Sequence, residues 1–124
     1  MNPIMLPLSY QQTYQTFLNL LKQLEEMLNA EADYEELKAG FSKLQQQFQQ
    51  EIMALTGEDL TGEIFSQWQS SQTEIHRTMR LLQTDMMFLQ TSRNPETSQQ
   101  RLATVRDRVE KLIQFTTSFT EKDS

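Results

Sequence analysis

The sequence contains no cysteine, and this absence removes several classes of site at once. A disulfide framework, a thiolate metal site and a cysteine nucleophile all require that residue. Histidine is nearly absent too, because His76 is the single one, and Glu74 two residues before it lies on a different face of a helix. Di-iron helical proteins need Glu-x-x-His on two helices, and no phosphate loop or serine elbow occurs. We therefore expect no enzyme, no metal or cofactor, and no small-molecule substrate.

Glycine and proline occur only three times each in 124 residues, which favours long helices over a sheet with many turns. Long hydrophobic runs are missing as well, since none approaches the roughly 20 residues of a membrane span. The opening residues MNPIMLPL lack the basic region of an export signal. We expect a soluble cytoplasmic protein with no membrane insertion, forming a single domain over residues 1–124.

Excess positive charge is also lacking, because the formal net charge is −6. Nucleic acid and anionic lipid bind proteins that present an excess of cations, so neither is an expected partner. The charge is unevenly spread: residues 1–62 carry three Lys and nine acidic residues, whereas residues 63–124 carry eight basic and eight acidic residues. The basic residues of the second half, mostly arginine, are the ones suited to a partner of opposite charge.

A long apolar periodicity is what the sequence does contain. Heptad positions a and d between residues 65 and 93 are occupied by Phe65, Trp68, Gln72, Ile75, Met79, Leu82, Met86, Leu89 and Arg93. This spacing predicts an amphipathic helix over residues 62–92, about eight turns long. Leu81 and Phe88 lie beside the seam and widen it, so that the helix has apolar surface for two neighbours.

Three further helices are predicted from apolar spacing, at about residues 10–29, 34–56 and 95–118. Ser9 with Gln12, and Asp33 with Glu36, have capping-box spacing at the first two starts. Asn94 before a proline suits the start of the last helix. Short connections place consecutive helices side by side, so the expected fold is all-α, an antiparallel (up-down-up-down) four-helix bundle with a long third helix.

The segments outside the helices also carry expectations. Residues 1–8 contain two prolines and are predicted to form an extended arm, and residues 117–124 are expected to fray. The second helix has Glu51 at a seam position and Gly40 in its interior, where we expect close approach of a neighbouring helix. Gly57 is expected to be the left-handed residue past the end of that helix.

Arg77 and Arg80 are the main candidates for partner binding. They lie one turn apart on the face away from the seam and offer two guanidinium groups to an acidic partner, with ordinary solvated charge as the alternative. The other candidates flank the seams of the third and fourth helices: His76, Met87, Arg101 and Arg108. The residues expected to form the core or a self-association surface are Trp68, Ile75, Met79, Leu81, Leu82, Phe88 and Leu89. Because Leu81 and Phe88 lie off the primary seam, we expect a homodimer.

The stretch WQSSQTEIHRTMRLLQTDMMFLQTSR, Trp68 to Arg93, resembles the signature region of the cyanobacterial heterocyst-frequency-control family, PatD. The chain length, the Gln-rich second helix and the segment RLATVRDRVEKLI also fit that family. The resemblance implies a non-enzymatic cytoplasmic regulator that binds the tubulin-like division protein FtsZ, modulates its assembly and tunes the frequency of heterocyst differentiation. The residues by themselves indicate only a helical partner-binding protein. A homo-oligomeric helical adaptor or structural module that binds another protein is the alternative.

Overall fold

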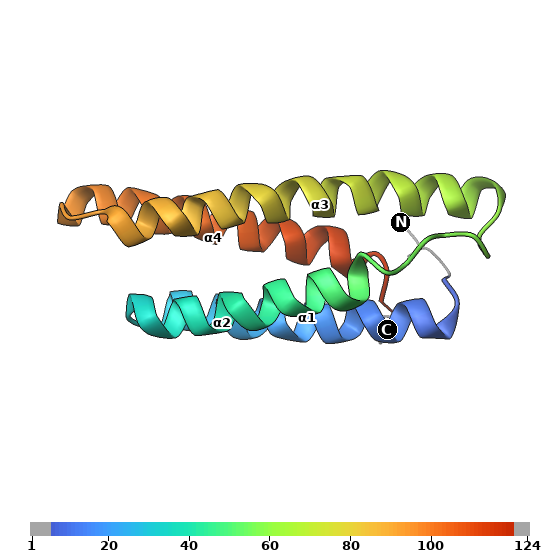
Figure 1. Cartoon of the computed structure of the whole chain (residues 1–124), viewed down its shortest axis with the longest axis horizontal. Helices are drawn as coiled ribbons and strands as arrows, with labels where there is room; N and C mark the ends of the chain where they lie inside the picture. The colour runs from blue at the N-terminus through green and yellow to red at the C-terminus, as the bar shows by residue number, and fades with distance from the viewer. Residues whose placement is uncertain (1–5, 121–124) are drawn as a thin grey trace.

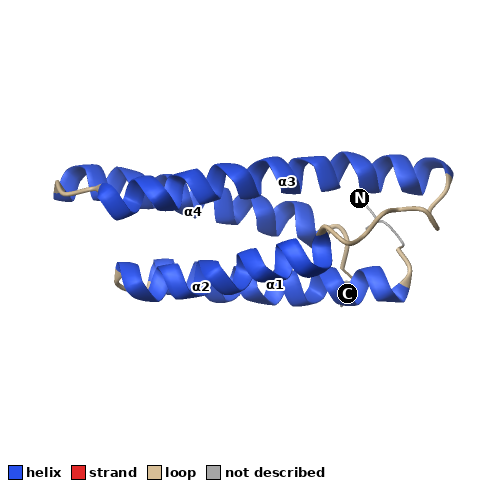
Figure 2. Cartoon of the chain, viewed as in Figure 1, coloured by secondary structure: helices blue, strands red, loops and turns tan. Residues whose placement is uncertain are grey.

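Four α-helices and one π-helical turn make up most of the chain (Figure 2). The computed structural model describes residues 6–120. The elements are α1 (Leu8–Asn29), α2 (Tyr34–Gln47), the π-helical turn η1 (Phe48–Ile52), α3 (Gly62–Thr91) and α4 (Pro95–Thr117). No strand occurs in this part of the chain, so the predicted all-α class is confirmed.

The four α-helices run along the long axis of the molecule (Figure 1). α3 packs most extensively against α4, α1 contacts both α4 and α2, and the contact between α2 and α3 is the smallest. α3 has 30 residues and α1 has 22. The α3–α4 connection consequently extends beyond the α1–α2 connection at one end of the molecule (Figure 1).

The seam predicted for the third helix lies in the core. Its residues from position 68 to position 89 are no more than 8% exposed: Trp68, Gln72, Ile75, Met79, Leu82, Met86 and Leu89. The two ends of the predicted seam differ from this. Phe65 is only partly buried, and Arg93 is exposed because α3 ends at Thr91 and Ser92 is already extended. The heptad pattern was thus right within the helix and wrong where the helix stops.

Two of the predicted helix starts have the expected caps. The Asp33 carboxylate accepts a hydrogen bond from the Glu36 amide at 2.9 Å. The Asn94 side chain accepts from the amides of Glu96 and Thr97 at 2.8 and 3.3 Å. Each side chain satisfies backbone donors that the first helical turn leaves without a partner.

The predicted start of the first helix is wrong. α1 begins at Leu8 after Pro7, and no side chain caps it, so Ser9 is already inside the helix. The Gln11 side chain instead donates to the Leu6 carbonyl at 2.6 Å. The extended arm is wrong only for Leu8, which is helical: Leu6 and Pro7 precede the helix, and Pro7 has an extended backbone with φ −54° and ψ 152°. Leu6 is 4% exposed and packs in the core, and residues 1–5 lie outside the described residues.

The predicted end of the second helix, at residue 56, is wrong because of the π-helical turn. The Met53 amide donates to the Phe48 carbonyl at 2.9 Å, a bond across five residues that widens the helix by one residue. The core position therefore passes from Glu51, which is exposed, to Ile52, which is 0% exposed. An unpaired carboxylate is costly to bury, and the wider turn avoids that cost.

The two glycine expectations are confirmed. A Cβ on Gly40 would lie 2.9 Å from the Met27 sulfur, so α1 does approach α2 closely there. Gly57 has a φ of 77°, in the left-handed region, although it lies in the α2–α3 connection and not directly after the helix.

The expected fraying at the C-terminus is wrong for residues 117–120. Phe119 is 0% exposed and Thr120 5% exposed. The Phe119 ring lies 4.5 Å, centroid to centroid, from the ring of Tyr14. Aromatic burial holds the chain against α1 beyond the last turn of α4, and residues 121–124 lie outside the described range.

Leu82 and Leu81 provide a matched test of the core. Leu82 is 0% exposed and Leu81 is 37% exposed, so Leu82→Ala should lower the free energy of unfolding by about 2–5 kcal/mol, because it leaves a cavity. Leu81→Ala should cost less, since Leu81 is partly exposed and water can fill part of the space that its side chain leaves. Urea denaturation of both variants measures the difference. Equal losses would remove Leu82 from the core.

Candidate functional site

The side of α3 that faces away from the core carries an exposed apolar and positively charged surface. We call it the α3 face, and it consists of Arg77, Arg80, Leu81, Met87 and Phe88, joined by Arg101 of α4. Leu81 is 37% exposed, Met87 61% and Phe88 46%. These are three of the six large hydrophobic side chains exposed in residues 6–120. Apolar side chains gathered on one helix face are typical of binding surfaces, whereas single scattered ones are not.

The cations of the α3 face come from two helices. The Arg101 guanidinium carbon lies 4.7 Å from the centre of the Phe88 ring, a cation–π contact between α4 and α3. Arg77 lies 3.8 Å from the Glu74 carboxylate, but the two side chains are 71% and 43% exposed, so water weakens this pair. Arg80 is exposed as well. Four of the predicted partner-binding residues, Arg77, Arg80, Met87 and Arg101, thus belong to one surface.

Arg108, another predicted partner-binding residue, has a different place. Its Nε donates to the Asp85 carboxylate at 2.9 Å, and the two side chains are only 25% and 13% exposed. The pair joins α4 to α3 beside the α3 face. Arg108 therefore serves a contact within the chain, and its charge is already matched.

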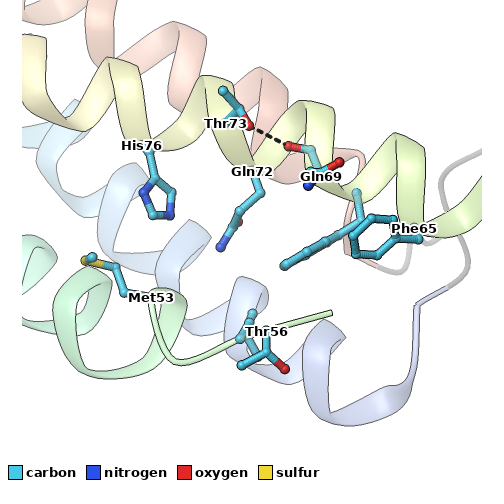
Figure 3. Close-up of a pocket in the computed structure, with 9 residues that line it drawn as sticks. Met53, Thr56, Phe65, Gln69, Gln72, Thr73 and His76 are labelled. Atoms are coloured by element: carbon cyan, nitrogen blue, oxygen red, sulfur yellow. Dashed lines mark hydrogen bonds between the residues drawn. The ribbon is translucent and has the colours of Figure 1, made fainter. Parts of the chain in front are cut away.

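His76 lies on another side of α3, where it lines a cavity of about 360 Å³ between α3 and the segment after η1. Figure 3 shows His76 and Gln72 on one side of this cavity, and Met53 and Thr56 on the other. The imidazole packs edge-on against the Phe48 ring, with centroids 5.0 Å apart. The structure thus places His76 in the wall of the cavity, one helical turn before Arg80 of the α3 face.

A buried network of hydrogen bonds holds the wall of this cavity. The Tyr14 hydroxyl donates to the Gln72 side-chain oxygen and accepts from the Trp68 indole nitrogen at 2.9 Å. The Gln72 amide nitrogen donates to the Ile52 carbonyl at 3.1 Å, at the end of η1. Burial raises the pKa of Tyr14, so the hydroxyl keeps its proton and stays a donor. The network links α1, α3 and η1.

A second hydroxyl fixes the α2–α3 connection. Tyr10 donates to the Asp59 carboxylate at 2.7 Å and accepts from the Gly57 amide at 3.1 Å. A Cβ on Gly57 would lie 2.5 Å from the Trp68 ring, so this backbone lies directly on α3. The roles of Tyr10, Tyr14 and Asp59 are not predicted by the sequence. Their hydrogen-bond partners lie far away in the chain, and local spacing carries no information about such pairs.

Metal-binding clusters and membrane-spanning helices are two further features that would indicate a function. Within residues 6–120, no group of three or more His, Asp or Glu side chains is placed to hold a metal ion. Over that same range, no helix combines the length and apolar character needed to cross a membrane.

Comparison with known proteins shows the family of this chain. A family model described as the CRR41 C-terminal domain matches residues 13–117. Neither a curated protein nor a solved structure matches the chain. The matched range contains the whole α3 face and the Tyr14 network.

Removal of the Tyr14 hydroxyl tests the buried network. Tyr14→Phe leaves the Trp68 indole and the Gln72 oxygen without that partner, so the free energy of unfolding should fall by about 1–3 kcal/mol. Tyr34→Phe, at a half-buried tyrosine of α2 outside the network, is the matched control. Chemical denaturation followed by the fluorescence of Trp68 measures both. A loss of unfolding free energy no larger than that of the control would show that the network contributes nothing to stability.

The pH dependence of stability tests the surroundings of His76. Burial, and secondly the charge of Arg80, lowers the pKa of His76 below its ordinary value of 6.5. The unfolded chain therefore binds the proton more readily than the folded one, and stability should fall as the pH drops from about 6.5 through the folded pKa. His76→Gln should remove this part of the loss of stability at low pH. Urea unfolding at pH 7.5 and 5.5 checks it, and identical pH dependence in both proteins would contradict it.

Proposed function

We propose that this chain, which belongs to the CRR41 C-terminal domain family, is a non-enzymatic cytoplasmic regulator that binds another protein through the α3 face. The partner we propose is FtsZ, as the resemblance of residues 68–93 to the PatD family implies. By binding FtsZ the protein modulates filament assembly and so tunes the frequency of heterocyst differentiation in a cyanobacterial cell.

The α3 face is the observation that supports this proposal. In a chain of net charge −6, it combines the exposed side chains of Leu81, Met87 and Phe88 with guanidinium groups on their flanks. Arginine, methionine and aromatic residues are enriched in protein interfaces, because they offer large contact areas together with directional hydrogen bonds. An acidic filament surface would be attracted to this face in spite of the overall negative charge.

The scaffold we propose for this surface is an antiparallel, up-down-up-down four-helix bundle. The short α1–α2 and α3–α4 connections and the contacts of α1 with α2, of α3 with α4 and of α1 with α4 are compatible with it. A bundle presents side chains from a rigid helix, so little conformational entropy is lost when the partner binds.

Bringing filaments together requires at least two contact points. A homodimer supplies them by symmetry, whereas a monomer needs a second surface. The exposure of Leu81, Met87 and Phe88 also favours the alternative function, a homo-oligomeric helical adaptor or structural module, in which the α3 face binds a second copy or another protein. Sedimentation equilibrium with and without FtsZ separates the two.

Charge reversal on the α3 face tests the FtsZ proposal. The double variant Arg77→Glu and Arg80→Glu should keep its helicity and melting temperature, because surface substitutions usually change stability by no more than about 0.5 kcal/mol. Co-sedimentation with FtsZ filaments should be strongly reduced.

The matched control is Lys38→Glu with Lys43→Glu, two exposed cations of α2. Both double variants change the net charge by the same amount, so a loss confined to the α3 variant assigns binding to that face. A folded α3 variant that co-sediments like the unaltered protein would contradict the assignment.

A further inference from the structure

We infer that the element docking on the α3 face is an acidic amphipathic α-helix, whose apolar side chains cover Leu81 and Phe88 and whose carboxylates pair with the surrounding arginines. This inference rests on the proposed role of the α3 face and deepens it, because it names the kind of element that the face recognises. It does not depend on the identity of the partner.

The spacing of the exposed apolar residues is the first reason. Leu81 and Phe88 are seven residues apart on one continuous helix, so they stand two turns and about 10.5 Å apart along its axis. A second helix with apolar residues at heptad spacing presents side chains at the same interval. Met87, next to Phe88 in the sequence, is unbranched and 61% exposed, and can adapt to the shape of the helix that docks.

The backbone of α3 is the second reason. Residues Gly62–Thr91 form one uninterrupted α-helix, in which the peptide groups at the α3 face bond to one another within the helix. One common way for an extended segment to bind is to add a strand to a sheet edge, where main-chain donors and acceptors are free. The α3 face has no such edge. Recognition at the α3 face therefore depends on side chains alone. A helix suits such a contact, because its backbone groups are already hydrogen-bonded within the helix.

The distribution of charge is the third reason. Arg77 and Arg80 stand on α3, and Arg101 reaches the face from α4 while its guanidinium stacks on Phe88. The N–H groups of a guanidinium that lies over an aromatic ring point outward in the plane of the guanidinium. They remain free to bind a carboxylate in bidentate fashion. Acidic residues on a docked helix would meet these three cations at the border of the apolar contact.

The carboxylates that border the α3 face do not prevent an acidic helix from binding there. Asp85 is held by Arg108 at 2.9 Å, so its charge is compensated inside the protein. Glu74 lies 3.8 Å from Arg77 in an exposed pair that water weakens, and a partner carboxylate can replace it at little cost. Arg108 therefore reduces the repulsion that the Asp85 carboxylate would exert on an acidic partner.

The same charges disfavour a second copy of the chain as the occupant. Two α3 faces in parallel contact would set Arg77 and Arg80 of one copy against the same arginines of the other, and like charges at an interface are costly. The net charge of −6 also opposes a nucleic acid, whose phosphates would be repelled by the rest of the surface.

A synthetic peptide tests the inference on the full chain. The probe is a helix of about three heptads with Leu at positions a and d and Glu at e and g, where repulsion between the Glu residues keeps it monomeric. Its matched control has Lys in place of every Glu. Titration followed by fluorescence anisotropy measures affinity, and NMR of the labelled protein locates the contact. We expect the Glu peptide to bind, to shift the Leu81 and Phe88 signals, and to outcompete the Lys peptide.

Two sets of variants divide the contact into its parts. Leu81→Ala with Phe88→Ala, and separately Arg77→Glu with Arg80→Glu, should each weaken the Glu peptide by about tenfold or more. Leu8→Ala with Ile64→Ala removes two exposed apolar side chains elsewhere and should leave the affinity unchanged. Lys38→Glu with Lys43→Glu is the charge control.

Several results would overturn the inference. They are no binding of the Glu peptide, equal binding of the Lys peptide or of a single-stranded oligonucleotide, signal shifts away from Leu81 and Phe88, or a dimer that hides these residues. The inference and the FtsZ proposal fail separately. Co-sedimentation with FtsZ but no peptide binding removes only the helix, whereas peptide binding without FtsZ co-sedimentation removes only FtsZ.

Discussion

The hydroxyl of Tyr14, buried between α1 and α3, is the contact on which the arrangement of this protein depends most. It donates to Gln72 and accepts from Trp68, and Gln72 in turn reaches the Ile52 carbonyl. A buried polar group without a partner costs about 1–3 kcal/mol, so these bonds are satisfied only when α1, α3 and η1 are in one register. Apolar packing alone would tolerate several registers of α3. The network favours one of them, while the apolar seam decides which side of α3 faces solvent.

The α3 face lies opposite the buried seam of α3. With Gln72 and the apolar seam turned inward, the opposite side of the helix presents Leu81, Phe88 and two arginines over several turns. α4 completes the surface, since Arg101 stacks on Phe88 and the Asp85–Arg108 pair holds the two helices together. We therefore propose that this member of the CRR41 C-terminal domain family binds its partner through a preformed surface, which limits the entropy lost on association.

Most of the helical architecture could be predicted from spacing, because burial of one helix side repeats along the chain with the helix period. The departures occurred where a distant contact outweighed a local signal. The π-helical turn exchanged Glu51 for Ile52 in the core, and Phe119 packed on Tyr14 beyond the end of α4. Each of these depends on space between elements that are far apart in sequence, and local propensity carries no information about that space.

The sequence by itself determined that α3 is a long amphipathic helix and that Arg77, Arg80 and Met87 lie off its buried side, since these facts follow from residues within a few turns of one another. Only the tertiary structure decided how the remaining cations are used. Arg101 joins the α3 face and Arg108 is bound to Asp85, although both flank the same predicted seam. Their difference arises from the positions at which α4 meets α3, and a pattern of charges along one helix does not contain the distances to another.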